Sequence, residues 1–273
     1  MTTLKDKTLF ITGGSRGIGR AIALGAAAEG ANVVIAAKTA APHPKLPGTI
    51  HTVAAEIEEA GGNALPLLLD VRDEDQVARA VASAARHFGG IDALVNNASA
   101  VFLAKAADTP VKRFDLMFDI NVRGTFVTSQ ACIPYLERAE NGHILTLAPP
   151  IDLRPGWFAN RTAYTMSKYA MSMTVLGLAE ELRAGAVAVN ALWPRTMIHT
   201  AASGIFGLGR AGCRSADIMA DAAHVILTRP SAACTGHFFL DEEVLRDEGV
   251  TDFTTYELVP GTPLEIDLFV SPG

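Results

Sequence analysis

Short apolar segments alternate with longer segments of mixed character along most of the chain. The apolar segments are almost continuously hydrophobic, which is typical of strands that helices cover on both faces. The segments between them have the apolar spacing of helices. The strands that this pattern predicts are Thr8–Ile11, Val33–Ala36, Leu65–Leu69, Ala93–Val95, His143–Leu147, Val187–Leu192 and His237–Leu240. The predicted helices are Ile18–Glu29, Ile50–Ala60, Glu74–His87, Val111–Ile120, Arg123–Glu137, Ala163–Arg183 and Ala216–Leu227.

This alternation of strand and helix predicts a single α/β domain. A strand, a helix and a second strand form a parallel unit with a right-handed crossover. We therefore expect a doubly wound parallel sheet of about seven strands with helices on both faces, which is a Rossmann fold. The sequence contains no internal repeat and no Gly/Ser linker that would divide residues 1–273 into two domains.

Three long loops and an irregular C-terminal tail complete the predicted organisation. The loops are Thr39–Gly48, Ala148–Asn160 and Pro194–Ser215. The tail, at about residues 241–273, has no clear periodicity, yet it contains many apolar side chains, which disordered segments rarely do. We therefore expect an ordered tail that packs on the body of the molecule or on a neighbouring subunit.

Composition and charge exclude several classes of function. The chain of 273 residues has a net charge of −6 and no long basic block, which argues against nucleic acid as a partner. No apolar stretch could span a membrane without a charge or a helix breaker, and the N-terminus does not resemble a signal peptide. Cys132, Cys213 and Cys234 are scattered, which fits a reducing compartment and gives no metal-site spacing. We therefore expect a cytoplasmic protein without a metal that acts on a small molecule.

A Gly-rich loop follows the first predicted strand and opens the first predicted helix. It reads Thr12-Gly-Gly-Ser-Arg-Gly-Ile-Gly19. Its glycines permit a tight turn and let the backbone approach a pyrophosphate, which the free N–H groups of the helix N-terminus would bind. Such a loop alone can be only a turn, but its position between strand and helix predicts a dinucleotide site. Its candidate cofactor-binding residues are Gly13, Ser15, Arg16, Gly17, Ile18 and Gly19.

The second predicted strand ends without the acidic residue that usually holds the ribose hydroxyls of NAD. The segment reads Ile35-Ala-Ala-Lys38, and no Asp or Glu occurs between Glu29 and Glu56. Lys38, together with Arg16, suits a 2′-phosphate, so we predict NADP(H) as the cofactor. The alternative is that both side chains are ordinary solvated charges.

Two further strand ends contribute candidate cofactor-binding residues. Asp70 and Val71 close the third strand, where a carboxylate could accept the adenine amino group. By itself, Asp70 would better fit a helix cap or a turn residue, but its place in this order of elements favours the cofactor site. Asn97 and Ala98 follow the fourth strand. The carboxyl ends of the strands are where a doubly wound sheet binds its ligands, so we expect the site there.

Tyr164 and Lys168 are the candidate catalytic pair. They lie four residues apart, which places both side chains on one face of the predicted helix. An isolated tyrosine has a pKa of about 10, too high for proton transfer at neutral pH, and a nearby ammonium lowers that pKa. The same lysine can reach the nicotinamide ribose. This spacing is common by chance, but downstream of a dinucleotide loop it indicates a carbonyl or alcohol that reacts with a nicotinamide.

Together these motifs resemble the short-chain dehydrogenase/reductase family over residues 7 to about 240. The matching segments are Thr12–Gly19, Asp70-Val71, Asn96-Asn-Ala98, Asn121, Tyr164 with Lys168, and Asn190-Ala-Leu-Trp-Pro194. More narrowly, segments such as Met171-Ser-Met173 and Trp193-Pro-Arg-Thr196 resemble the hydroxysteroid-dehydrogenase-like subgroup. Animal members of that subgroup carry a C-terminal sterol-carrier domain, which we do not expect here. The resemblance implies that Tyr164 is the acid/base, that Asn121 holds a water linking Lys168 to solvent, and that Ile198 and Thr200 contact the nicotinamide end.

Two positions depart from the family pattern. The fifth strand of the family usually ends in a serine that hydrogen-bonds the substrate oxygen, and here Pro149, preceded by Ala148, takes that place. Thr146 is the nearest upstream hydroxyl, but it lies in the strand. The family's Pro-Gly after the sixth strand is Pro194-Arg195. Loss of one such donor costs about 3–4 kcal/mol, which slows the chemistry without abolishing it.

The function that we predict is an NADP(H)-dependent oxidoreductase that interconverts a secondary alcohol and a carbonyl. The alternative is a cofactor-binding protein of the same fold with little or no redox turnover; a lyase or epimerase is a third hypothesis. The apolar Ile205, Phe206 and Leu208 favour an apolar substrate. The helix at residues 163–183 is apolar around most of its circumference, which predicts a homodimer or homotetramer.

Overall fold

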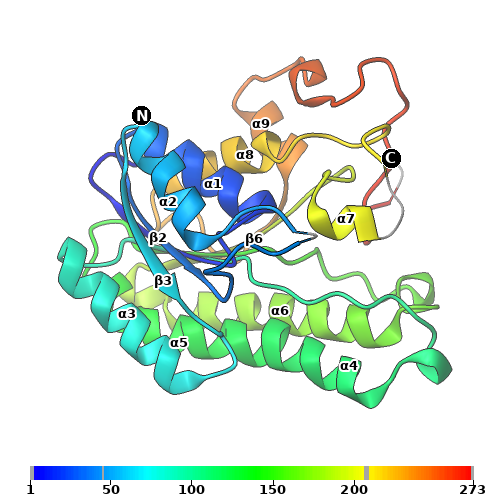
Figure 1. The fold of residues 1–273 in the computed structure, drawn as a ribbon, viewed down its shortest axis with the longest axis horizontal. Coiled ribbons are helices and arrows are strands. Elements are labelled where there is room, and N and C mark those ends of the chain that lie inside the picture. Colours follow the sequence, from blue (N-terminus) through cyan, green and yellow to red (C-terminus); the bar gives the residue numbers. More distant parts are fainter. Residues whose placement is uncertain (1–2, 45, 206–208, 272–273) are drawn as a thin grey trace.

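One seven-stranded parallel sheet forms the centre of the molecule. The computed structural model describes residues 3–44, 46–205 and 209–271. The strands lie in the order β3-β2-β1-β4-β5-β6-β7 (Figure 1). From β1, inside the sheet, the chain adds β2 and β3 on one side and then β4 to β7 on the other, which is the predicted doubly wound arrangement. The strands are β1 (Thr8–Thr12), β2 (Asn32–Ala37), β3 (Asn63–Leu68), β4 (Ala93–Asn96), β5 (His143–Thr146), β6 (Ala188–Trp193) and β7 (Phe238–Leu240).

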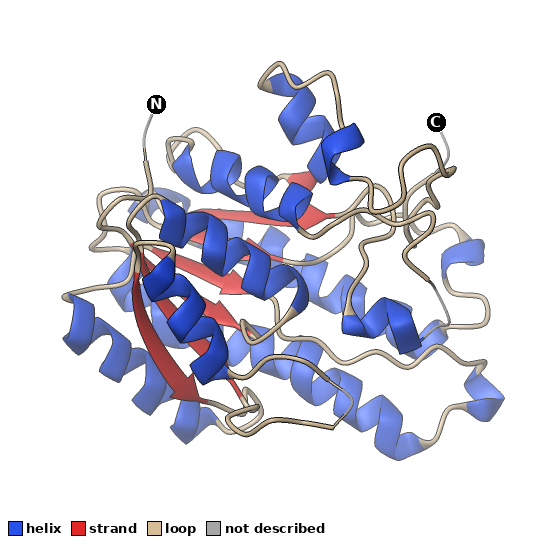
Figure 2. Cartoon of the chain, turned by 45° about the horizontal axis from the view of Figure 1, so that its top comes forward, coloured by secondary structure: helices blue, strands red, loops and turns tan. Residues whose placement is uncertain are grey.

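Helices cover both faces of this sheet, and Figure 2 shows the strands as a twisted layer between them. In Figure 1, α3, α4, α5 and α6 lie below the sheet, and α1, α2, α8 and α9 lie above it. The helices are α1 (Gly17–Ala28), α2 (Ile50–Glu59), α3 (Glu74–Phe88), α4 (Val111–Met117), α5 (Thr125–Leu136), α6 (Thr162–Glu181), α7 (Ala201–Ile205), α8 (Asp217–Thr228) and α9 (Asp241–Asp247). None of the helices in these described segments is long and apolar enough to cross a bilayer.

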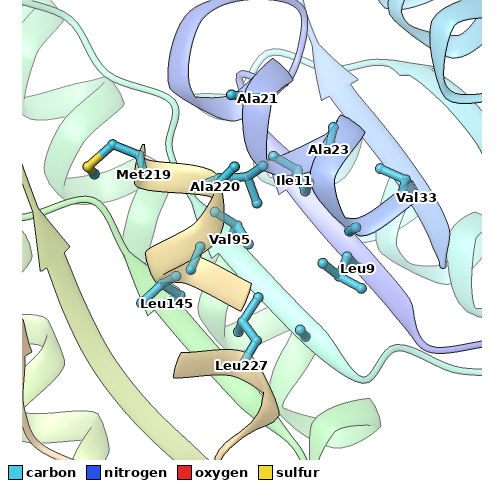
Figure 3. Packing of buried hydrophobic residues seen from close by; sticks show 14 of the residues in the cluster. Leu9, Ile11, Ala21, Ala23, Val33, Val95, Leu145, Met219, Ala220 and Leu227 are labelled. Carbon is cyan, nitrogen blue, oxygen red and sulfur yellow. The ribbon is translucent and has the colours of Figure 1, made fainter. Parts of the chain in front are cut away.

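The upper core is built from branched strand residues and small helix residues (Figure 3). Leu9, Ile11 and Val95 are fully buried beneath α1 and α8. Both helices present alanines to this layer, and a Cβ added at Gly25 of α1 would lie 3.4 Å from the Cβ of Ala220. The small side chains therefore let α1 and α8 pack closely over β1 and β4, which fixes the start of α1 above the sheet edge.

The sequence predicted a break between two helices near residue 121, and that prediction was wrong. A π-helical segment, η2 (Phe118–Gly124), instead joins α4 to α5 without interruption. Wider turns of this kind often occur at functional sites. Here the turn accompanies the burial of Asn121, whose side chain bonds to a neighbouring loop and to α6. Its amide therefore ties α6 to the loop after β4.

The C-terminal region also differs from the irregular chain predicted from Asp241 onward. It begins with α9, where Glu242 and Arg246 form an ion pair four residues apart at 3.2 Å. The rest, which we call the tail (residues 248–271), contains a short helix η5 (Thr254–Tyr256) and folds back onto the body. Phe253, Phe269 and Val270 are buried.

Candidate active site

A cleft of about 650 Å³ lies at the carboxyl ends of the strands. Residues that follow β1, β2, β3, β4, β5 and β6 line it, together with part of the tail. A second hollow, of about 430 Å³, lies at the opposite ends of β1 and β4, between Thr8 and Asp92. None of the predicted site residues lines that second hollow, so the candidate chemistry belongs to the first, which we call the cleft.

The Gly-rich loop after β1 has the backbone geometry that the sequence predicted. Gly13 and Gly17 have φ values of +67° and +57°, a region that favours glycine. A Cβ at Gly13 would also lie 2.9 Å from the Cα of Ala98. Both glycines line the cleft, together with Ser15, Arg16 and Ile18. The loop therefore presents bare backbone to any group that occupies this end of the cleft.

Gly19 has a different role from the other glycines of the loop, because it does not line the cleft. A Cβ there would lie 2.4 Å from Nδ2 of Asn97. That amide donates to the carbonyl oxygens of Thr12, at 2.9 Å, and Gly13, at 3.1 Å. Gly19 therefore makes room for the Asn97 side chain, which holds the Gly-rich loop against the end of β4.

The N-terminus of α1 opens onto the same end of the cleft. Its first turn, Gly17–Arg20, contains no acidic residue that would compete with an anion for its N–H groups. Arg16 stands at the cap position and donates from Nε to the Pro47 carbonyl and from Nη2 to that of Gly48, both at 3.0 Å. These bonds fold the predicted loop at residues 39–48 against the Gly-rich loop. The guanidinium thus stays at the rim of the cleft with part of its hydrogen-bonding capacity already used.

Lys38 and Asp70 flank the part of the cleft that lies beyond β2 and β3. Lys38 is exposed, and both residues line the cleft with Val71. Hydrogen bonds from Arg72 hold the pKa of the Asp70 carboxyl below its usual range, and the positive charge of Lys38 lowers it further. Nε of Arg72 lies 2.9 and 3.0 Å from the two carboxylate oxygens. An adenine amino group would therefore compete with Arg72 for Asp70.

Tyr164 and Lys168 lie one turn apart on α6, and both line the cleft. The Lys168 side chain reaches the end of β5, where Nζ donates to the Leu147 carbonyl at 2.7 Å. Its Nζ also lies 5.0 Å from the centroid of the Trp193 ring. Lys168 is only 2% exposed, and burial lowers its pKa to about 7. The amine and the ammonium forms of Lys168 are therefore close in free energy at neutral pH.

The pKa of Tyr164 is raised above its usual value, which is opposite to the direction that the sequence predicted. Burial is the main cause, and the negative charge of Asp267 adds to it. Tyr164 is 7% exposed because the tail closes over it, with the Phe269 ring centroid 6.2 Å from its own. The sequence argument considered only Lys168 and could not include a carboxylate that lies a hundred residues downstream.

Asn121 lies behind the cleft rather than on its surface. Its Oδ1 accepts from the Ala100 N–H at 2.7 Å, and its Nδ2 donates to Oγ of Ser167 at 3.0 Å. Ser167 and Lys168 are neighbours on α6, so these bonds fix the helix turn that carries the lysine. The neighbouring Ile120 lines the cleft, whereas Asn121 is fully buried.

The end of β5 supplies no hydroxyl to the cleft, as the sequence predicted from the missing serine. Among residues 146–150, which the structure describes in full, only Leu147 lines the cleft. The Pro149 carbonyl accepts from Oγ of Ser172 at 2.7 Å, which holds this segment against α6. Any second donor to a substrate oxygen must therefore come from elsewhere.

The loop after β6 closes the cleft from the other side. Ile198 and Thr200 line it, and a Cβ at Gly17 would lie 3.4 Å from Cγ2 of Thr200. The loop therefore meets the Gly-rich loop, and contact of Ile198 and Thr200 with the nicotinamide end stays a prediction. The side chains of Ile205, Phe206 and Leu208, on which the prediction of an apolar substrate rested, lie outside the described residues.

The tail contributes a part of the cleft that the sequence did not predict. Its lining residues are Glu265, Ile266, Asp267 and Leu268. The only signal in the sequence was the apolar composition of the tail, which predicted packing but not a location. Across the described segments, no group of three or more His, Cys, Asp or Glu side chains is placed to hold a metal ion.

Comparison with known proteins identifies the class. The family model for the short chain dehydrogenase matches residues 7–206, so the chain belongs to the short-chain dehydrogenase/reductase family of oxidoreductases. Two relatives are named hydroxysteroid dehydrogenase-like protein 2: the Danio rerio protein is 59% identical over 96% of this chain and the Homo sapiens protein 56% over 96%. This chain spans 63% of the length of each of them.

A solved structure agrees with this assignment over the whole chain. The crystal structure of a putative dehydrogenase from Xanthomonas campestris has a TM-score of 0.96 and 55% identity, with 100% of both chains covered. The likeness therefore includes the tail as well as the sheet.

Proposed function

We propose that this protein is an NADP(H)-dependent oxidoreductase that interconverts a secondary alcohol and a carbonyl on an apolar small molecule. The observation that carries the proposal is the placement of Tyr164 and Lys168 in the same cleft as the glycines of the α1 N-terminus. A dinucleotide bound along the carboxyl edge of the sheet would therefore reach from the Gly-rich loop to the acid/base pair.

The residues that line the cleft fit the cofactor. Gly13, Gly17 and the N–H groups of the first turn of α1 would hold the pyrophosphate, because their bare backbone and the helix dipole suit an anion. Lys38 and the rim guanidinium of Arg16 would face the 2′-phosphate. Asp70 and Val71 would border the adenine, while Ile198 and Thr200 would border the nicotinamide end.

The proton chemistry follows from the two side chains of α6. When bound, the nicotinamide would supply or accept the hydride. Tyr164 would donate its phenolic proton to the substrate oxygen in reduction and take a proton back in oxidation. Lys168, held at the end of β5 by the Leu147 carbonyl, would grip the ribose and, when charged, stabilise the phenolate. Asn121 would support the pair by holding the lysine turn in place.

An apolar substrate is the best match to the remainder of the cleft. Beside the tail carboxylates, aliphatic side chains line it from the loop after β4, from α4 and η2, and from the tail: Val101, Leu103, Leu116, Ile120 and Leu268. Burial of apolar surface against such a wall would supply most of the binding free energy. We place the reaction in the cytoplasm, which agrees with three free, buried cysteines.

We also propose that the protein is a homodimer or a homotetramer. The face of α6 that points away from the sheet carries Met166, Met173 and Leu176, which are 43%, 56% and 48% exposed. Phe126 on the neighbouring α5 is 50% exposed. Pairing of this surface with its copy about a two-fold axis would cover these side chains.

The test of the proposed function is NADPH oxidation against a panel of ketones and aldehydes of increasing apolar size. Steady turnover with at least one bulky apolar ketone, and slower turnover with NADH, is the expected result. The alternative function is a cofactor-binding protein with little redox turnover, which the missing β5 hydroxyl favours. Tight NADPH binding by titration calorimetry without turnover across the panel would select that alternative.

A further inference from the structure

The tail is fixed to the wall of the cleft by backbone pairing. Residues 265–267 run antiparallel to residues 195–197, just after β6: the Met197 N–H donates to the Glu265 carbonyl at 2.8 Å, and the Asp267 N–H to the Arg195 carbonyl at 3.0 Å. The indole Nε1 of Trp193 adds a bond to the Leu268 carbonyl at 2.8 Å. Asp267 is therefore held in a defined position on the cleft wall.

The indole of Trp193 lies between Asp267 and Lys168. The Lys168 ammonium packs over its face, with Nζ at 5.0 Å from the ring centroid. Its N–H edge points to the tail, where it donates to the Leu268 carbonyl next to Asp267, and this polar edge lowers the pKa of the Asp267 carboxyl. A positive group on the face and a negative group at the edge match the charge distribution of an aromatic ring. The arrangement thus couples the tail carboxylate to the buried lysine.

Burial shifts the pKa values of Asp267 and Lys168 toward each other. It raises the pKa of Asp267 to about 7, to which the nearby Asp241 charge contributes, and it lowers that of Lys168 to about 7. The negative charge of Asp267 opposes the fall in the Lys168 pKa and also raises the pKa of Tyr164. The charged or titratable groups that interact with Asp267 from the elements around it are Tyr164, Lys168, Cys213 and Asp241. Glu265, two residues earlier, also lines the cleft.

We propose that Asp267 is a positioning residue of the catalytic centre, whose carboxylate favours the protonated form of the buried Lys168, so that the C-terminal tail completes the site. This inference rests on the proposed function for its catalytic meaning. Without a negative charge beside it, Lys168 would lose its proton more readily in an environment that excludes water. A neutral amine would not stabilise the Tyr164 phenolate, and it would donate weaker hydrogen bonds to the ribose hydroxyls. Asp267 acts on the reaction only through these two side chains.

The direct test is a pH titration of Lys168 by NMR of its ε-carbon in the full chain without cofactor, with Lys168→Met for assignment. Asp267→Asn should lower the titration midpoint by about one pH unit, the lower end of the effect of an adjacent opposite charge. Asp267→Glu, which keeps the charge, should restore most of the shift. Asp247→Asn, which removes an exposed carboxylate of α9 that does not line the cleft, should change nothing.

A second variant protects the test against misfolding of Asp267→Asn. Trp193→Phe keeps a ring face for Lys168 and removes the N–H that holds the tail, so it should shift the midpoint in the same direction by a smaller amount. An unchanged midpoint in every folded variant of Asp267 and Trp193 would overturn the inference. Because the titration needs no turnover, it decides the role of Asp267 even if the panel of carbonyls gives no activity.

The proposed role of Asp267 also predicts a change in the pH dependence of kcat/KM. In Asp267→Asn, the loss of kcat/KM for carbonyl reduction with rising pH should begin about one pH unit lower than in the wild type. Asp267→Glu should return the profile toward that of the wild type. A profile that falls uniformly at all pH values would point to a purely structural role for the tail and contradict the proposal.

Discussion

Replacement of Lys38 by aspartate is the change that most sharply tests the predicted cofactor preference. Lys38 is exposed at the end of β2 and lines the cleft opposite Asp70. Arg16, the other cation near the proposed 2′-phosphate, is partly engaged by the Pro47 and Gly48 carbonyls. Lys38 should therefore make the larger contribution to discrimination between NADPH and NADH.

The magnitude follows from the exposure of the lysine. At about 4 Å in high dielectric, one pair of unit charges is worth roughly 1 kcal/mol. A phosphate carries about −1.5 to −2 charges at pH 7, so Lys38 should contribute about 1.5–2 kcal/mol, or roughly 10- to 30-fold. Lys38→Asp replaces this attraction by a repulsion of similar size. The preference for NADPH should therefore fall by roughly 100-fold or more, and salt should reduce the effect.

Titration calorimetry of both cofactors at low ionic strength is the assay. The wild type should bind NADPH at least about tenfold more tightly than NADH, and Lys38→Asp should abolish or reverse that order. Lys112→Asp, an exposed charge reversal on α4 away from the cleft, is the matched control and should leave the ratio unchanged. Equal affinity of the wild type for the two cofactors would refute the reasoning.

Three further outcomes are expected. Leu176→Glu should shift the protein toward the monomer in light scattering at micromolar concentration, and a wild type that is already monomeric would contradict the proposed interface. Glu242→Gln should lower the free energy of unfolding by about 3 kcal/mol or more in denaturant titrations, because it leaves the buried Arg214 guanidinium without its carboxylate partner; a loss below about 1 kcal/mol, typical of a surface pair, would count against this. The pKa of Asp267 rises to about 7 on folding, so the folded state binds the extra proton and the stability of the wild type should fall between about pH 4 and pH 7. Asp267→Asn should flatten that decline, leaving the smaller part due to Asp241, and an unchanged slope would show that Asp267 does not titrate in this range.

Much of the fold could be predicted because the relevant signals are local. Each strand is a short apolar segment, and the parallel, doubly wound sheet follows from the alternation with helices. The exceptions are also instructive. The π-helical turn at η2 accompanies bonds from Asn121 to the loop after β4 and to α6, which helical periodicity does not report. The segment Asp241–Asp247 was predicted as irregular because α9 is only seven residues long.

The same difference between local and long-range signals applies to the site residues. The Gly-rich loop, Lys38 and the pair on α6 are sequence motifs, and the structure brings them to one cleft. The assignment of Gly19 to the cofactor stays a prediction; the structure adds that a Cβ there would meet the side chain of Asn97. The direction of the Tyr164 pKa was wrong because the tail, which buries the tyrosine and brings Asp267 near it, is far away in sequence. Contacts of that range have no signature in a single sequence.

The rate of NADPH oxidation by Tyr164→Phe, with a carbonyl compound that the wild type reduces, tests the central claim most directly. The phenyl ring keeps the packing against Phe269 and removes only the hydroxyl that would exchange the proton. We expect NADPH affinity close to that of the wild type and a loss of turnover by a factor of about 10² or more. Turnover of Tyr164→Phe at the wild-type rate would contradict the account.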